Sequence, residues 1–270
     1  MTRVISKDGT QIAYDRQGNG PTVVLVGGGL ADRSENAPLA VELARTFTVY
    51  NYDRRGRGLS GDTLPYAVDR ELEDLEALIT ETGGSVHLYG VSSGGALVLE
   101  AAAAGLLVDR IGVYEVPYFV TDEMTAQWQQ YVKDLDALLA DNRRGDALAL
   151  FMTLAGTPEE MIASSRGTPE WKASEEIVHT LAYDAACLGD GRPPVDRLAK
   201  LTHPALVATG TSLDQYMQQL DPGFFDDAAD AIVAAMPQAQ REIVPVDSHV
   251  ADPSVVGCPD PGTLLHSITG

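Results

Sequence analysis

Short apolar runs alternate with longer stretches of helical periodicity along this chain of 270 residues. The run at residues 22–26 is continuously apolar and β-branched, which is typical of a strand buried on both faces of a sheet. Apolar runs of this kind, together with alternating patterns, predict strands over residues 4–5, 11–14, 22–26, 47–52, 85–89, 110–114, 205–209 and 241–244. The first two strands flank Asp8-Gly9, a hairpin turn. Helical patterns predict helices over residues 37–45, 69–82, 94–104 and 226–236.

This alternation of strand and helix predicts an α/β fold, with a mostly parallel, doubly wound sheet that is covered on both faces. Strand signals stop once, between about residues 120 and 199, where the pattern is helical. We therefore expect a core of residues 1–117 and 200–270 and a helical cap of residues 118–199, inserted after the sixth strand. Such an insertion lies at the carboxyl ends of the strands, where open α/β sheets bind ligands. The pattern of residues 261–268 predicts a last helix.

Composition narrows the classes of partner. The chain has 19 Lys and Arg against 39 Asp and Glu, a formal net charge of −20, and a surface of this sign repels nucleic acid and anionic membranes. Cys187 and Cys258 form neither a CxxC motif nor a disulfide framework, and the first residues contain no apolar signal sequence. We expect a cytoplasmic protein that acts on a small molecule; the sequence leaves open whether it forms a homodimer.

The motif Gly90-Val91-Ser92-Ser93-Gly94 lies between a predicted strand and a predicted buried helix. In that context G-x-S-x-G forms a sharp turn that exposes the central serine, here Ser92, as a nucleophile. The helix N-terminus then points at this serine, and the backbone N–H of Ser93 can stabilise an oxyanion. Ser93 occupies the variable position of the motif, so its hydroxyl is not the expected nucleophile. The alternative interpretation is a loop that only turns the chain.

A second glycine loop, Gly27-Gly28-Gly29, follows the first buried strand. It lacks the Gly-Lys-Ser/Thr ending of a phosphate-binding P-loop. We interpret it as the other half of an oxyanion hole, with the N–H of Gly29 facing Ser92; a plain tight turn is the alternative. Of the five histidines, His249 follows the last predicted strand, so it reaches the same edge of the sheet and is the expected general base.

The acidic partner of His249 stays open between two residues. Asp214 follows the strand at 205–209 and is the default position, although it falls one residue later than usual. Glu115 directly follows the strand at 110–114, and that strand ends at the same edge of the sheet. Asp247 is too close to His249 in sequence to orient it easily.

The segment from Asp53 to Ser60 carries Arg54, Arg55 and Arg57 in an otherwise acidic chain. We interpret it as a structural loop in which Asp53 and the arginines pair locally and glycines make the turns. An anion-binding site is the alternative. The sequence shows no metal-binding spacing such as H-E-x-x-H, and we expect neither a metal nor a cofactor.

Taken together, the segment 52–60, the motif 90–94 and the late His249 resemble the α/β-hydrolase superfamily over nearly the whole chain. The resemblance implies Ser92 as nucleophile, His249 as base and the amides of Ser93 and Gly29 as oxyanion hole. Many members carry His-Gly where this chain has Gly27-Gly28, and the usual Gly-x-x-Asp is replaced by residues 210–213. Members with a carboxylate at the position of Glu115 exist, so the resemblance leaves the acid open.

The expected activity is hydrolysis of a small to medium, apolar ester, lactone or related acyl compound through an acyl-enzyme on Ser92. A serine at this position argues against epoxide hydrolase or dehalogenase chemistry, which needs a carboxylate. The apolar character of the substrate rests on six residues of the predicted cap: Tyr118, Phe119, Trp128, Phe151, Met152 and Trp171. The alternative is a non-hydrolytic protein of the same fold, a cyclase, a lyase or a ligand-binding receptor.

Overall fold

The computed structural model describes residues 2–250. Within this range the chain forms an eight-stranded sheet of order β1-β2-β4-β3-β5-β6-β7-β8. The strands are β1 (Thr2–Ile5), β2 (Gln11–Gly18), β3 (Thr22–Val26), β4 (Thr48–Tyr52), β5 (Val86–Val91), β6 (Val108–Tyr114), β7 (Ala205–Gly210) and β8 (Ala239–Val244). From β4 to β8 every pairing is parallel, whereas β1 and β2 are antiparallel to their neighbours. The predicted α/β fold with a mostly parallel sheet is confirmed.

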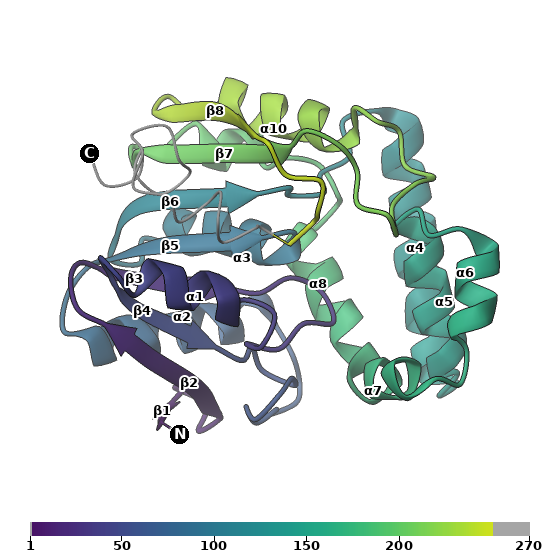
Figure 1. The fold of residues 1–270 in the computed structure, drawn as a ribbon, viewed down its shortest axis with the longest axis horizontal. Helices are drawn as coiled ribbons and strands as arrows, with labels where there is room; N and C mark the ends of the chain where they lie inside the picture. The colour runs from purple at the N-terminus through teal and green to yellow at the C-terminus, as the bar shows by residue number, and fades with distance from the viewer. Residues whose placement is uncertain (1, 251–270) are drawn as a thin grey trace.

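Helices cover both faces of this sheet (Figure 1). Alternate residues of β3 show the two faces: Val24 and Val26 belong to one buried apolar cluster, and Val23 and Leu25 to another. The first cluster contains the apolar faces of α2 (Val68–Thr82), α3 (Ser93–Ala103) and α10 (Phe224–Ala235). The second contains that of α1 (Ala37–Leu43). Each predicted strand and each of these four helices is present, and β2 continues beyond the predicted end to Gly18 because it pairs along its length with β4.

Between β6 and β7 the described chain is helical: α4 (Asp122–Ala140), α5 (Arg144–Leu154), α6 (Glu159–Ser165), α7 (Pro169–Ile177), a 3-10 turn (Val178–Thr180), α8 (Leu181–Leu188) and α9 (Val195–Leu198). Local signals begin two of these helices, since Thr121 and Thr168 accept hydrogen bonds from the N–H groups of Met124 and Trp171. Helices α4 to α7 lie beyond the carboxyl ends of the strands, and α8 returns to pack on α3 (Figure 1). The division into a core and a cap at residues 118 and 199 stays a prediction.

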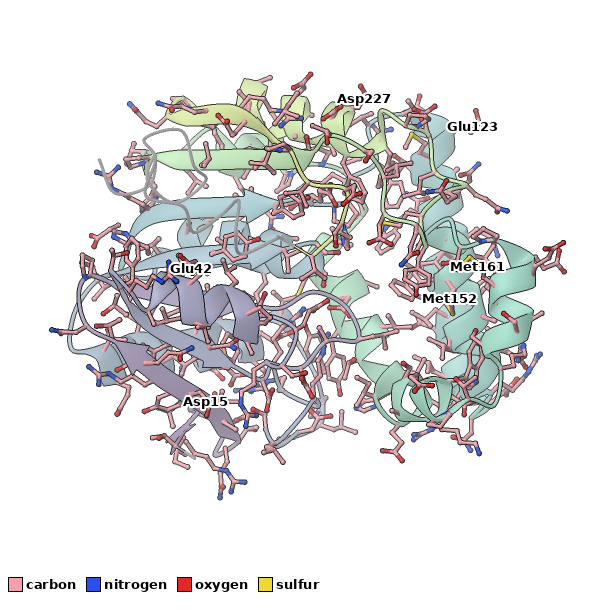
Figure 2. All side chains as sticks on the ribbon, in the orientation of Figure 1. Asp15, Glu42, Glu123, Met152, Met161 and Asp227 are labelled. Carbon is pink, nitrogen blue, oxygen red and sulfur yellow. The ribbon has the colours of Figure 1, made fainter. Side chains whose placement is uncertain are left out.

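Exposed acidic side chains such as Asp15, Glu123 and Asp227 project outward from separate parts of the fold (Figure 2). Among residues 2–250 no helix is long and apolar enough to cross a membrane. The predicted helix at residues 261–268, Cys258 and His266 lie outside the described residues.

Candidate active site

Ser92 occupies the sharp turn between β5 and α3. Its backbone has φ 55° and ψ −129°, a conformation that costs free energy in a residue other than glycine and that occurs mainly at functional sites. Close backbone contacts hold the turn: a Cβ on Gly90 would lie 2.4 Å from the carbonyl oxygen of Gly94, and one on Gly94 would lie 2.5 Å from that of Gly27. The N–H of Ser92 also donates to the carbonyl of Tyr114 at the end of β6 (2.9 Å). The motif therefore adopts the conformation that its glycines predict.

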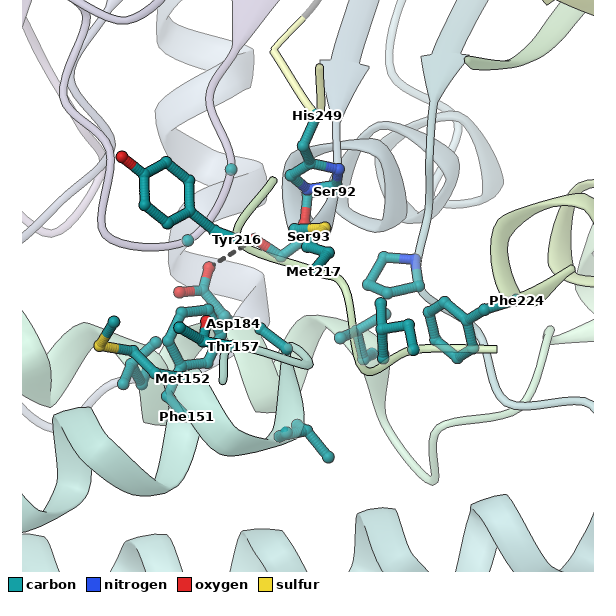
Figure 3. A pocket seen from close by; sticks show the side chains of 18 of the residues that line it. Ser92, Ser93, Phe151, Met152, Thr157, Asp184, Tyr216, Met217, Phe224 and His249 are labelled. Carbon is teal, nitrogen blue, oxygen red and sulfur yellow. Dashed lines mark hydrogen bonds between the residues drawn. The ribbon is translucent and has the colours of Figure 1, made fainter. Parts of the chain in front are cut away.

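His249 lies beside this turn, and its ring contacts Glu115. The Nδ1 atom of His249 is 2.6 Å from Oε2 of Glu115, and the other carboxylate oxygen of Glu115 accepts from the N–H of Gly210 (3.0 Å). Glu115 is buried, at 5% exposure. Figure 3 shows the Ser92 hydroxyl directed at the imidazole of His249. Ser92 and His249 line one cavity, and Glu115 contacts the ring of His249.

Asp214, the default acid in the sequence, does not contact the ring. Its carboxylate accepts a hydrogen bond from the main-chain N–H of His249 (3.3 Å) and from that of Tyr216 (2.9 Å). The physical reason is the loop length: Glu115 directly follows β6, whereas Asp214 lies several residues into the loop after β7, beyond the edge of the sheet. Of the two carboxylates, only Glu115 is placed to orient the imidazole.

The glycine loop after β3 borders the same space. A Cβ on Gly28 would lie 3.2 Å from Cβ of Ser92, and one on Gly29 would lie 3.3 Å from a carboxylate oxygen of Asp184. Arg57 donates to the carbonyl of Gly28. Because C=O and N–H point in opposite directions in a trans peptide, this bond fixes the direction of the Gly29 N–H away from Arg57. An arginine thus anchors the glycine loop.

The three arginines after β4 are fully buried, and their partners are remote in sequence. Arg54 forms a two-pronged ion pair with Glu71 on α2 (2.7 Å for both bonds) and also donates to Asp184 on α8 (2.8 Å). Arg57 donates to Asp184 as well (2.7 Å). Asp53 accepts instead from Arg33 and from the N–H of Leu59 (2.7 Å). The predicted local pairing of Asp53 with the arginines is therefore wrong.

Arg55 follows the same pattern with a different pair of carboxylates. It contacts Asp74 on α2 (2.7 Å) and Asp8 before β2 (2.9 Å). Burial by itself raises the pKa of Asp8, but hydrogen bonds from Thr10 and Arg55 outweigh it and lower that pKa to about 2. Buried guanidinium groups need several hydrogen-bond acceptors. For each of these arginines the acceptors lie on elements that are distant in sequence and adjacent only in the folded chain.

A cavity of about 300 Å³ opens above Ser92, between the carboxyl ends of the strands and the helices that follow β6. Most of its lining is apolar and includes Phe119, Trp128, Phe151 and Met152, four of the residues on which the expectation of an apolar substrate rests. Trp171 and Tyr118 are buried elsewhere in the apolar core and do not line it. The lining side chains with a polar group include those of Glu35, Tyr131, Ser92, Ser93, Thr157, Asp184, Tyr216 and His249, and Figure 3 labels all of these except Glu35 and Tyr131.

Two carboxyl groups in this lining were not foreseen from the sequence. Burial raises the pKa of Glu35, against the opposing charges of His249 and Arg57, and its Oε2 atom has no partner among the described residues. Asp184 is a single charged residue in the otherwise apolar stretch of α8. A single charged residue in an apolar helix, such as Asp184, is a signal in the sequence that could have indicated a buried polar site. Within residues 2–250 no group of His, Cys, Asp and Glu side chains is arranged to hold a metal ion.

Comparisons with known proteins agree with the fold. The model of the alpha/beta hydrolase family matches residues 23–259. An alpha/beta hydrolase of known structure from Sphaerobacter thermophilus DSM 20745 is 43% identical, with a TM-score of 0.82 over 95% of this chain and 97% of that one. The uncharacterized hydrolase YraK from Bacillus subtilis (strain 168) is 33% identical over 66% of this chain and 69% of its own. An esterase from Exiguobacterium antarcticum shares the fold at 19% identity and a TM-score of 0.67, over 90% of each chain.

Proposed function

Because this chain belongs to the alpha/beta hydrolase family, we propose that it is a serine hydrolase that cleaves carboxylic esters or lactones through an acyl-enzyme on Ser92. The observation that carries the proposal is the 2.6 Å contact between Glu115 and Nδ1 of His249, on a ring toward which the Ser92 hydroxyl is directed. An ionised carboxylate only accepts hydrogen bonds, so Nδ1 carries the proton of the neutral ring. The remaining nitrogen, Nε2, is then free to accept the Ser92 proton.

In the proposed reaction, Oγ of Ser92 attacks the carbonyl carbon while Nε2 of His249 takes its proton. The N–H groups of Ser93 and Gly29 stabilise the negative charge that develops on the carbonyl oxygen. The protonated His249 then gives its proton to the leaving oxygen as the bond to the carbonyl carbon breaks. A water, deprotonated by His249, attacks the acyl-enzyme, and Ser92 regains its proton as the acid is released.

Arg57 and Arg54 act in this scheme as positioning residues. They donate to the carbonyls of Gly28 and Gly27, and Arg54 does so at 3.3 Å. Preorganised donors stabilise a transition state without reorganising during the reaction, so a loop held by buried cations suits an oxyanion hole. The two arginines thus hold the glycine loop in this chain.

The substrate that suits the cavity is small to medium and mostly apolar. The volume of about 300 Å³ lies at the lower end of the range for ligand sites, and the lining is mostly apolar and aromatic. We propose that residues 118–199 act as a cap that supplies much of this lining. The cytoplasmic location, the absence of a cofactor and the open question of a homodimer stay predictions.

Hydrolysis of p-nitrophenyl esters and of simple lactones by the wild type and by Ser92→Ala tests the proposal. We expect turnover by the wild type with a burst of p-nitrophenol, because the acyl-enzyme accumulates when deacylation is slower. Turnover in Ser92→Ala should fall by at least about 10³-fold. Undiminished turnover in that variant would contradict the assignment of Ser92. We give less weight to a cyclase, lyase or receptor, since Glu115 contacts the ring and arginines hold the glycine loop.

A further inference from the structure

Asp184 is a buried carboxylate in the cavity wall, and the proposed reaction does not use it. Its side chain is 8% exposed. One of its oxygens, Oδ1, accepts three hydrogen bonds, from Arg54 (2.8 Å), Arg57 (2.7 Å) and the hydroxyl of Ser93 (2.7 Å). All the donors that reach this carboxylate therefore converge on one of its two oxygens.

The other oxygen, Oδ2, has no hydrogen-bond partner among the described residues. It lies beside the glycine loop, 3.3 Å from the position that a Cβ on Gly29 would take. Figure 3 shows Oδ1 joined to Ser93 and Oδ2 directed to the opposite side of the group. Asp184 lines the cavity, and Gly28, the neighbour of Gly29 in the loop, lies against Ser92, since a Cβ on Gly28 would be 3.2 Å from Cβ of Ser92. Oδ2 therefore lies on the Gly29 side of the cavity wall, one loop residue away from the contact with Ser92.

The charge state of Asp184 makes this oxygen an acceptor. Burial alone raises the pKa of Asp184, but the charges of Arg57 and Arg54 outweigh it and hold that pKa below its usual value. A buried acceptor on an ionised group is costly when it stays unpaired. Oδ2 has no protein partner within residues 2–250, so a donor group of a bound ligand is able to pair it.

The surrounding charges favour a neutral donor over a cation. Arg54 and Arg57 are balanced by Glu71 and Asp184, so the cluster carries no net charge. A ligand cation would lie next to two guanidinium groups with no excess negative charge to offset them. A hydroxyl or an amide N–H makes the same hydrogen bond without that repulsion.

We infer that Asp184 is a specificity-determining residue, whose Oδ2 binds a hydroxyl or amide N–H of the substrate close to the scissile carbonyl. The inference rests on the proposed serine hydrolase activity and narrows its substrate class. The substrate is an ester or lactone with an apolar body and one neutral hydrogen-bond donor near the carbonyl group. A plain aliphatic ester fills the cavity but leaves Oδ2 unpaired.

Matched esters, measured by proton release in a pH-stat, test this preference in the wild type. The probes are methyl 3-hydroxybutyrate and methyl lactate, each against the ester in which a methyl group replaces the hydroxyl, methyl isovalerate and methyl isobutyrate. We expect kcat/KM to favour at least one hydroxy ester by about 10- to 100-fold, as for a hydrogen bond to a charged group. Hydrolysis of all four esters without a preference for either hydroxyl overturns the inference and leaves the proposed function standing. Hydrolysis of none of these, nor of p-nitrophenyl esters, overturns both.

Asp184→Asn then tests which residue sets the preference. The amide oxygen satisfies Arg54, Arg57 and Ser93, so the amide N–H₂ group takes the place of Oδ2 and presents a donor to the cavity. In the wild type a hydroxy ester should outpace its methyl ether, whose oxygen only accepts. In Asp184→Asn this ratio should fall at least about tenfold, because both esters can accept from the amide.

The ratio is compared within each variant, so a general loss of activity does not affect it. Asp136→Asn, an identical change at an exposed site on α4, is the control and should keep the wild-type ratio. An unchanged ratio in folded Asp184→Asn would show that Asp184 serves the ion-pair network alone. If the variant does not fold, the wild-type preference for a hydroxy ester over its methyl ether still decides the inference.

Discussion

The carboxylate of Glu115 lies 2.6 Å from Nδ1 of His249. Glu115 directly follows β6, the strand that pairs with β5, and β5 leads into the Ser92 turn. The backbone of Glu115 is in the left-handed region, at φ 48°, which is unusual for a residue other than glycine. The backbone is thus strained at Glu115, the residue whose carboxylate contacts the imidazole ring.

Glu115→Gln should lower kcat for ester hydrolysis by about 10³- to 10⁴-fold, because an amide neither fixes the tautomer of His249 nor stabilises its protonated form. Asp214→Asn is the matched change, and it should cost less than about tenfold, since Asp214 contacts only the main chain of His249. Steady-state kinetics with p-nitrophenyl butyrate measure both. The reverse order of the two losses would assign the acid to Asp214.

Arg54→Met should lower the free energy of unfolding by about 3 to 5 kcal/mol, because it leaves Glu71 buried without its charged partner and removes one of the two arginines that pair with Asp184. Arg45→Met removes a solvent-exposed pair with Glu42 and should cost less than about 1 kcal/mol. Urea unfolding at pH 7 gives both values. Equal losses in the two variants would mean that the buried network adds nothing to stability.

Gly90→Ala should destabilise the fold by about 3 kcal/mol or more, since the new methyl group meets backbone 2.4 Å away and the strand and helix must separate. Gly84→Ala is the control, because a Cβ there has no neighbour within 4 Å. Thermal unfolding compares the two. A Gly90→Ala protein as stable as the control would show that the Ser92 turn is less tightly held than its contacts indicate.

Glu35→Gln should stabilise the protein at neutral pH, and the gain should disappear in acid. Burial raises the pKa of Glu35 above its ordinary value of 4.5, although His249 and Arg57 oppose the shift and Asp32 adds to it. Well below pH 4.5 the group is protonated in both the folded and unfolded states and contributes nothing. As the pH rises through the folded pKa, the folded wild type must hold a buried charge, which the amide avoids.

Urea unfolding of Glu35→Gln and wild type at several pH values between 4 and 8 checks this sign. The difference in unfolding free energy should grow with pH. A difference that is constant, or that is largest at the acid end, would mean that Glu35 ionises in the folded state without penalty.

Sequence patterns predicted the sheet well because a strand buried on both faces has to be apolar throughout. The run at residues 22–26 forms β3. The glycines of the motif 90–94 lie so close to neighbouring backbone that no side chain fits there. Helix α10 began near its predicted place, since its apolar spacing matches one buried face. These features depend on residues close together in the chain.

The partners of the buried charges could not be predicted in the same way. Arg54 meets Asp184 across 130 positions of sequence, and only the return of α8 onto α3 brings them together. The helical pattern over residues 69–82 gave no sign of these partners, yet Glu71 and Asp74 on α2 are buried against arginines. The choice between Glu115 and Asp214 depended on loop geometry, because both residues follow strands that end at the same edge of the sheet.

Labelling with a fluorophosphonate, read by intact mass and by peptide mapping, tests the central claim most directly. Such a reagent reacts with a serine whose hydroxyl is activated by a neighbouring base. We expect one adduct on the wild type, located on Ser92 and not on Ser93, no adduct on Ser92→Ala, and labelling at least about 10²-fold slower in His249→Ala. An adduct on folded Ser92→Ala at the wild-type rate, or none on folded wild type, would contradict the account.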